Sequence, residues 1–268
     1  MNDLFTAMSG AVAQERKLDI ISNNLANITT AGFRKEDASI SAVAPEFKFA
    51  DLWDAQLEGV DNAELPQAST HLRLAKIHRP EINLSPGAIV KTDHPLDVAL
   101  LESSTEMKGR AFFVVESPNG ELLARDGKFA FAEFEGHPRL VHQSSGYPVL
   151  DSGGKTIDLP SAEVVVHANG QIESDGKEIA RLRVVTFDPA ERLTRKGNGL
   201  YGVNNPDAVT DLEPEQYKLQ QGYLEQSNVN AVDELVRMIR VQRSYEAMVK
   251  SMMTSDETRS RAISVALQ

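Results

Sequence analysis

The chain has 268 residues, enough for one large domain or two ordinary ones, and its 41% hydrophobic and 25% charged residues are typical of a folded globular protein. Its 39 acidic residues outnumber 28 basic ones and give a formal net charge of −11. This balance argues against a nucleic-acid binder, whose affinity depends on neutralising phosphates, and against adsorption to anionic lipid. The absence of cysteine excludes disulfides, thiol nucleophiles and cysteine zinc sites.

No membrane-spanning helix and no cleaved secretory signal are expected. No apolar run approaches the roughly 18 residues that a transmembrane helix needs. Charged residues from Asp3 to Asp19 interrupt the N-terminal segment, and no basic start precedes an apolar block. If the chain leaves the cytosol, it therefore uses a route without such a signal.

The net charge lies in the middle of the sequence. Residues 1–35 sum to +1 and residues 225–268 to zero, whereas residues 36–224 hold 18 basic and 30 acidic side chains. A self-repelling middle between two nearly neutral ends suggests a solvated body whose ends are made for packing. Ordinary surface acidity explains the middle equally well.

A helix is predicted over about residues 3–26. Apolar residues recur there at alternating steps of three and four, which is the spacing of a coiled-coil stripe. The eight positions are Leu4, Ala7, Ala11, Gln14, Leu18, Ile21, Leu25 and Ile28, and all but Gln14 are apolar. After the helix, Asn27, Thr29 and Thr30 compete for backbone hydrogen bonds, and Gly32 can adopt the positive φ that turns the chain away.

Residues 36–84 are predicted to form an extended connector. They contain the only tryptophan, Trp53, a short predicted helix near 47–58 and a loop-like stretch over 62–70.

An antiparallel β-rich region is predicted over residues 85–215. Turn signals recur at hairpin spacing, and the segments between them alternate or are rich in β-formers. The turn signals are Pro118-Asn119-Gly120, Asp126-Gly127, Asn169-Gly170, Asp175-Gly176 and Gly197-Asn198-Gly199. The predicted strands are 111–116, 128–134, 163–168 and 178–187.

A second long helix is predicted from Asn230 or Asp233 almost to Gln268. No glycine or proline follows Gly222, and the apolar positions again step by three and four. The ten positions of this stripe, of which seven are apolar, are Leu235, Met238, Gln242, Tyr245, Val249, Met252, Asp256, Arg259, Ile263 and Ala266. A helix of about 35 residues is about 50 Å long, which exceeds what a compact domain of this size needs.

The sequence predicts no catalytic, cofactor or metal site. The six histidines show no ligand pairing such as HExxH. Residues 197–202 match GxGxxG in letters but read as a turn, and residues 152–155 match SxxK but contain two glycines and read as a hairpin loop. The paired carboxylates of residues 207–215 read as a solvated acidic loop.

The two helical ends allow two interpretations. Each stripe could pack on the β region or on the other helix inside one monomer. Narrow stripes on terminal helices attached to a separate β body favour packing between chains instead.

Motifs at both ends resemble the bacterial flagellar rod and hook protein family. The N-terminal motif runs from Ile21 to Arg34 (ISNNLANITTAGFR), and the C-terminal one from Gly222 to Asn230 (GYLEQSNVN) and on to Glu246. The stretches Pro95–Leu100 (PLDVAL) and Arg125–Phe129 (RDGKF) resemble the family's β-domain motifs. The resemblance covers most of the chain and is weakest over 36–84.

Within the family, the length argues against the hook protein and leaves the proximal and distal rod proteins. The stretch Pro95–Leu100 is more similar to the proximal one, whereas Met238–Glu246 is as similar to the distal one. The sequence Gly109-Arg110-Ala111-Phe112-Phe113 departs from the GxGFF of distal-rod relatives. These features favour a proximal rod subunit, with a distal one as the alternative.

The resemblance implies an α+β fold, in which long N- and C-terminal helices pair as a coiled-coil-like bundle beside a central antiparallel β-rich domain. Residues 1–35 together with 222–268 would form the helical assembly domain, 36–84 the connector, and 85–215 the outer domain. The implied assembly residues are Leu4, Ala11, Leu18, Ile21, Asn24, Leu25, Asn27, Gly32, Phe33, Asn228, Asn230, Leu235, Ile239, Tyr245, Val249 and Met252.

The implied function is that of a structural subunit of a torque-transmitting rod in the periplasm, exported through the flagellar secretion channel. Its partners would be other copies, other rod proteins, the export apparatus and surrounding rings, without cofactor, nucleic acid or membrane insertion. A cell-wall glycan hydrolase and a soluble adaptor are the remote alternatives.

Overall fold

The computed structural model describes residues 2–43, 74–103, 110–134, 137–160, 163–188 and 190–266. It divides into two compact units, which are described separately. The first comprises Met1–Asn23, Asp37–Pro80 and Val232–Gln268, and the second comprises Asn24–Glu36 and Glu81–Ala231. The helix expected near 47–58, Trp53 and the loop expected over 62–70 lie outside the described residues.

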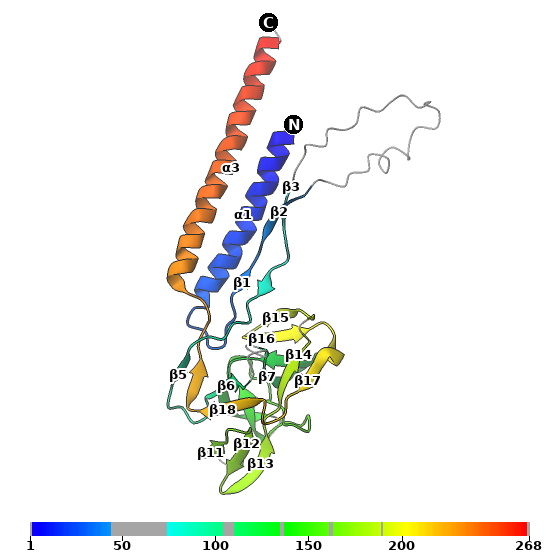
Figure 1. The fold of residues 1–268 in the computed structure, drawn as a ribbon, viewed down its shortest axis with the longest axis vertical. Helices are drawn as coiled ribbons and strands as arrows, with labels where there is room; N and C mark the ends of the chain where they lie inside the picture. Colours follow the sequence, from blue (N-terminus) through cyan, green and yellow to red (C-terminus); the bar gives the residue numbers. More distant parts are fainter. Residues whose placement is uncertain are drawn as a thin grey trace, which may run out of the picture. The chain divides into compact units, whose positions relative to one another are not determined.

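The first unit is built on two long helices. Helix α1 spans Asn2–Ala26 and helix α3 spans Ala231–Ala266, close to the ranges predicted from apolar spacing. The two helices lie alongside each other with opposite chain directions (Figure 1), and Met248 packs over Gly10, where an added Cβ would lie 2.7 Å from Met248 Sδ. Among the described residues, no helix is both long enough and apolar enough to cross a membrane.

A short antiparallel pair completes the described part of the first unit. Strand β2 (Ile40–Val43) pairs with β3 (Leu74–Ile77). The backbone N–H of Ala75 donates to Ser9 Oγ at 3.0 Å, so this pair is attached to α1.

The second unit is β-rich, and every strand register that it shows is antiparallel, as predicted. Its main sheet has the order β15-β16-β8-β7-β14-β17, with strands Leu193–Gly197, Leu200–Val203, Gly120–Ala124, Phe112–Ser117, Val184–Phe187 and Val209–Asp211. A smaller sheet joins β11 (Val164–Val166), β12 (Gln171–Ser174) and β13 (Lys177–Arg181).

Four two-stranded pairs accompany these sheets. They are β1 (Glu36–Asp37) with β4 (Glu81–Ile82), β5 (Ile89–Lys91) with β19 (Tyr223–Glu225), β6 (Val98–Glu102) with β18 (Tyr217–Gln221), and β9 (Phe129–Phe134) with β10 (His137–His142). Through β18 and β19 the segment just before α3 is part of the β unit.

Strand β7 runs through the centre of the core. Its residues alternate between two hydrophobic clusters, because successive side chains of a strand point to opposite faces. Phe113 packs edge-to-face on Phe129 with 5.1 Å between ring centroids, and Phe112 packs on Tyr201 at 5.7 Å. The main sheet is therefore covered on both faces at this strand.

Most of the predicted turns are present. Those at 118–120, 169–170, 175–176 and 197–199 each join neighbouring antiparallel strands. The hairpin turn predicted at Asp126-Gly127 is wrong. These two residues are buried and in extended chain, where they pass close to the backbone of Val98. A Cβ on Gly127 would lie 1.8 Å from Val98 O, so the glycine permits a close backbone approach. The segment 178–187, predicted as one strand, is split into β13 and β14.

Replacing Phe113 by alanine should destabilise the second unit by about 3–5 kcal/mol, because Phe113 is fully buried and its removal leaves a cavity. Phe131→Ala is the matched control, since Phe131 lies on β9 with 43% of its surface exposed. Urea denaturation of both variants measures the difference. Equal midpoints for the two variants would contradict this assignment of the core.

Candidate assembly interface

After α1 the chain makes a turn that is stabilised by hydrogen bonds from asparagine side chains. Asn24 is fully buried; its Nδ2 donates to Glu36 O, and its Oδ1 accepts from Glu36 N–H, both at 2.9 Å. Asn27 Oδ1 accepts a hydrogen bond from Thr30 Oγ1 at 3.2 Å. Asn24 thus satisfies both backbone groups of Glu36, as a neighbouring strand would.

Gly32 lets this turn pass directly over the β unit. It has φ +63°, and its N–H donates to Glu225 O at 2.7 Å. A Cβ at this position would lie 2.4 Å from Asp126 N, so any other residue would meet backbone. Two requirements therefore coincide at Gly32, a left-handed conformation and the absence of a side chain.

The residues around this crossing form a buried cluster of charges, which we call the Glu225 cluster: Arg34, Glu102, Arg125 and Glu225. Glu225 Oε1 lies 2.6 Å from Arg34 Nη1, and Glu225 Oε2 lies 2.7 Å from Arg125 Nε. Arg125 is also paired with Glu102. Two positive and two negative groups thus compensate one another away from water, where an unpaired charge would be costly.

The electrostatics of the two arginines differ. Burial, followed by repulsion from Arg125, lowers the pKa of Arg34 to about 10. Burial acts on Arg125 in the same direction, but Glu225 and Glu102 together outweigh it and raise the pKa of that guanidinium. Among the described residues, Arg34 Nε and Nη2 have no hydrogen-bond partner, so Arg34 is the less well compensated of the two.

The C-terminal segment before α3 binds the N-terminal turn through Asn228. Its Oδ1 accepts from Lys35 N–H at 2.7 Å, and its Nδ2 donates to Asn83 O at 2.9 Å and Ser85 O at 2.8 Å. The Arg195 guanidinium lies 4.0 Å above the Phe33 ring. The N-terminal and C-terminal motifs are therefore joined to each other inside the β unit.

The predicted assembly residues fall into three groups. The side chain of Leu4 lies outside the described part of the structure. Buried are Ala11, Ile21, Asn24, Gly32 and Phe33, and half-buried are Leu18, Leu25, Asn27, Asn228, Tyr245, Val249 and Met252. Asn230, Leu235 and Ile239 are exposed in the single chain.

The sequence patterns did not predict the Glu225 cluster. Arg34, Arg125 and Glu225 all stand inside the motifs that carry the family resemblance, but their spacing does not show that they meet. Glu225 lies 100 residues after Arg125 in the chain. No local pattern in these motifs indicates the contact.

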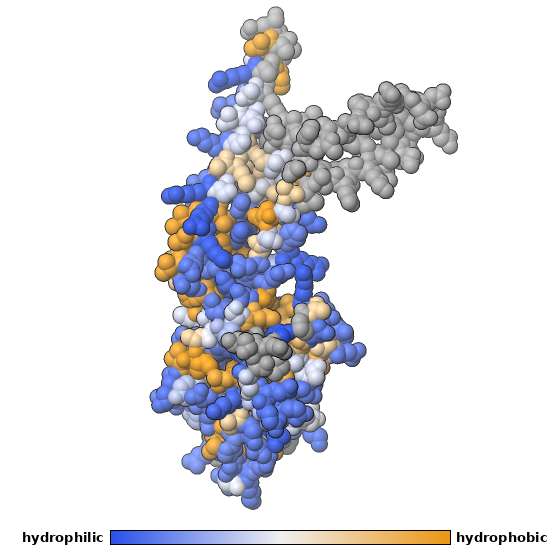
Figure 2. Space-filling view, in the orientation of Figure 1, coloured by the Kyte–Doolittle hydropathy of each residue, from blue (hydrophilic) through white to orange (hydrophobic). Residues whose placement is uncertain are grey.

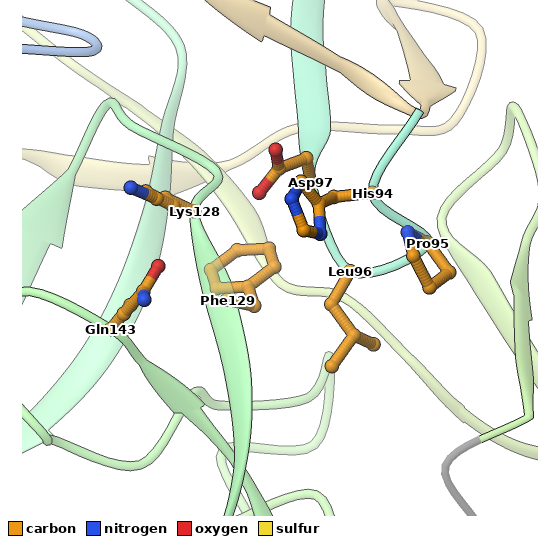
Figure 3. A pocket seen from close by; sticks show the side chains of 7 residues that line it. All are labelled: His94, Pro95, Leu96, Asp97, Lys128, Phe129 and Gln143. Carbon is orange, nitrogen blue, oxygen red and sulfur yellow. The ribbon is translucent and has the colours of Figure 1, made fainter. Parts of the chain in front are cut away.

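A cleft of about 270 Å³ opens in the second unit (Figure 3). The cleft is lined by His94, Pro95, Leu96, Asp97, Lys128, Phe129 and Gln143. Within the described ranges, no group of three His, Cys, Asp or Glu residues could hold a metal ion. The cleft therefore supplies single polar groups and no recognisable catalytic set.

A buried histidine was also not anticipated. His142 Nε2 lies 2.8 Å from Asp126 Oδ1, and His142 Nδ1 lies 2.8 Å from Ser145 Oγ. The three residue types are those of a hydrolase triad, but the imidazole is fully buried and both of its nitrogens are engaged. Burial raises the pKa of the Asp126 carboxyl, although His142 opposes that shift. We therefore assign the His142–Asp126 pair a structural role, which is to hold the Asp126 segment in place against Gly32.

Comparisons with known proteins agree with these motifs. The family model described as flagella basal body rod protein matches residues 4–34, and the model described as flagellar basal body rod FlgEFG protein C-terminal matches residues 220–265. The chain is 31% identical over 263 residues to flagellar basal-body rod protein FlgF of Mesorhizobium japonicum, which covers 96% of this chain and 95% of that protein. It is 32% identical over 270 residues to flagellar basal-body rod protein FlgG of Buchnera aphidicola subsp. Schizaphis graminum, which covers 95% of both chains.

These matches define a component of the flagellar basal body. The chain belongs to the flagellar basal-body rod protein family. It is accordingly a structural rod subunit, and its terminal motifs are the segments that the two family models match.

Replacing Gly32 by alanine should destabilise the second unit by several kcal/mol, because a positive φ and a backbone clash act together. Gly146→Ala separates the two effects. Gly146 has φ +73° with nothing within 4 Å of its added Cβ, so this variant should lose only about 1 kcal/mol. Thermal unfolding of both variants checks the prediction, and a similar loss for both would refute the clash.

Replacing Glu225 by glutamine should destabilise the unit by about 3–5 kcal/mol, because it leaves two buried arginines with one carboxylate. The control is Glu121→Gln, since Glu121 forms an ion pair with Arg183 but its side chain is 50% exposed. That loss should stay within about 1 kcal/mol. Chemical denaturation measures both, and a Glu225→Gln variant as stable as the control would contradict the role of the cluster.

Proposed function

We propose that the chain self-assembles and co-assembles with other rod proteins through its terminal helices. The product is the helical axial shaft that transmits torque across the periplasm. The subunit has no catalytic role in this proposal. Passage through the flagellar export apparatus and contact with surrounding rings belong to the same proposal.

The observation that carries this proposal is an exposed apolar surface on α3. Val232, Leu235, Val236 and Ile239 are 67%, 49%, 42% and 51% exposed, and their spacing of three and four residues places them on one face. Figure 2 shows apolar side chains gathered over the N-terminal part of α3. A contiguous exposed apolar surface of this kind marks a site of association.

The helix has a second, inward face that the chain itself covers. Val241 is buried, and Tyr245, Met248 and Met252 are half-buried. Opposite faces of one helix thus serve two contacts, one inside the first unit and one available to another subunit. This division supports assembly in which the subunit's own helix pair remains intact, as in a coiled-coil-like bundle shared between chains.

We further propose a proximal position in the rod, with a distal position as the alternative. The support is the similarity of Pro95–Leu100 to the proximal proteins and the departure of residues 109–113 from the distal pattern. Relatives named FlgF and FlgG match this chain at similar identity over nearly its whole length, so identity alone does not choose between the two positions.

Replacing Ile239 by aspartate should abolish incorporation into basal bodies while the isolated chain stays folded. The side chain is half exposed in the monomer, but an aspartate buried in a subunit contact would cost several kcal/mol. The matched control is Val165→Asp on β11, since Val165 is also 51% exposed. Immunoblots of purified hook–basal bodies measure incorporation. Normal incorporation of the Ile239→Asp variant would refute assembly through this face.

A further inference from the structure

The two central motifs of the sequence, residues 95–100 and 125–129, meet at the cleft of the second unit. The proposed assembly through α1 and α3 gives these motifs no role. Residues 95–97 line the cleft from the first motif, and residues 128–129 line it from the second. Figure 3 shows the two segments on opposite sides of the cleft, with the Asp97 carboxylate directed into the space between them. The cleft is therefore a candidate binding site built from segments that the helices do not use.

Hydrogen bonds fix the walls of this cleft. Gln221 Nε2 donates to Pro95 O at 2.6 Å, and Gly222 N–H donates to Asp97 O at 2.7 Å. An isolated antiparallel bridge between Asp97 and Lys128 joins the two walls. The site is thus formed before any ligand enters, so binding requires little ordering of the chain.

Asp97 is a buried polar residue that the fold leaves without a partner for its side chain. The residue is only 4% exposed, and within the described ranges its carboxylate makes no hydrogen bond or ion pair. By contrast, the buried carboxylate of Glu225 contacts Arg34 at 2.6 Å. A carboxylate that is shielded from water and unpaired is costly, and a cation that enters the cleft removes that cost.

We propose that the cleft binds the cationic tip of a lysine or arginine side chain from a partner protein, with the Asp97 carboxylate as its counter-ion. The volume of about 270 Å³ is below the roughly 300–1,000 Å³ of pockets for drug-sized ligands, so it suits a single side chain. Pro95 and Leu96 supply apolar contact for the aliphatic stem. Residues 81–231 of this unit include 23 acidic and 14 basic side chains, an excess that attracts a cationic segment.

Lys128 allows a cation site to be distinguished from an anion site. It lies opposite Asp97 in the antiparallel bridge, but it is exposed and forms no ion pair with any residue that the structure describes. Its ammonium group repels a second cation beside Asp97, whereas it would attract an anion. Removal of the Lys128 charge therefore strengthens the binding of a cation and weakens the binding of an anion.

Titration of the full-length chain with N-acetyl-arginine amide and with N-acetyl-lysine amide tests the proposal. The backbone amide signals of residues 96–97 and 128–129 in NMR spectra report binding. N-acetyl-citrulline amide is the matched neutral compound, since it has nearly the shape of the arginine compound without its charge. At least one cationic compound should produce saturable shifts at these residues and bind about tenfold more tightly than the citrulline compound.

Three variants connect this binding to the cleft. Asp97→Asn keeps the shape of the side chain but removes its charge, and it should weaken binding of the cationic compound about tenfold. Asp93→Asn is the matched control and should bind as the wild type does, because the Asp93 side chain is 73% exposed and pairs with Lys91. Lys128→Ala should strengthen binding about threefold. Unchanged amide signals away from the cleft verify that each variant is folded.

Saturable binding that depends on Asp97 and on the charge of the compound supports the site. The proposal is overturned by no saturable binding of either cationic compound, by equal affinity for the citrulline compound, or by an Asp97→Asn variant that binds as tightly as the wild type. Weaker binding by Lys128→Ala also overturns it, because that result indicates an anion site. These results are independent of assembly through the terminal helices, which incorporation of the Ile239→Asp variant tests separately.

Discussion

The contact between Glu225 and two arginines is the constraint on which the second unit depends. Arg34 belongs to the turn after α1, Glu225 to the strand before α3, and Arg125 to the β unit, so one carboxylate joins three segments that are distant in the sequence. The contact is buried, which makes it costly to break from either side. It requires Gly32 to cross Arg125 and Asp126 without a side chain, and it requires Asn24 and Asn228 to satisfy the backbone on either side of the turn. The two family motifs are therefore two halves of one packed structure.

This arrangement separates two tasks within each terminal segment. The residues nearest the β unit anchor the chain, through hydrogen bonds and buried charges. Farther along, α1 and α3 carry exposed apolar side chains, which we propose contact other subunits. A shaft that carries torque needs both, since close-packed contacts inside and between subunits deform little. The Glu225 cluster fixes both terminal segments to the β unit.

The regular features of the fold followed from sequence patterns. Apolar spacing located α1 and α3, and turn dipeptides located most hairpins, because both signals are local. Asp126-Gly127 was assigned to a hairpin because Asp-Gly is a common turn dipeptide. Glycine is also used where two backbones approach closely, and only the position of Val98 in the fold shows that this second use applies here. Glu225 and its arginines could not be paired from sequence, since nothing local encodes a contact across 100 residues. The sequence pattern also could not show which face of α3 is buried, because the helix carries apolar residues on two faces. Val241 is buried and Leu235 is exposed because the rest of the first unit covers only the face that carries Val241.

Quantitative mass spectrometry of purified hook–basal bodies, before and after the hook and filament are sheared away, tests the central claim most directly. The claim is that this chain is a structural subunit of the rod, proposed to lie in its proximal part. The account predicts that the chain remains in the ring-bound core after shearing, at low copy number. Loss of the chain together with the hook and filament, or its absence from both preparations, would contradict it.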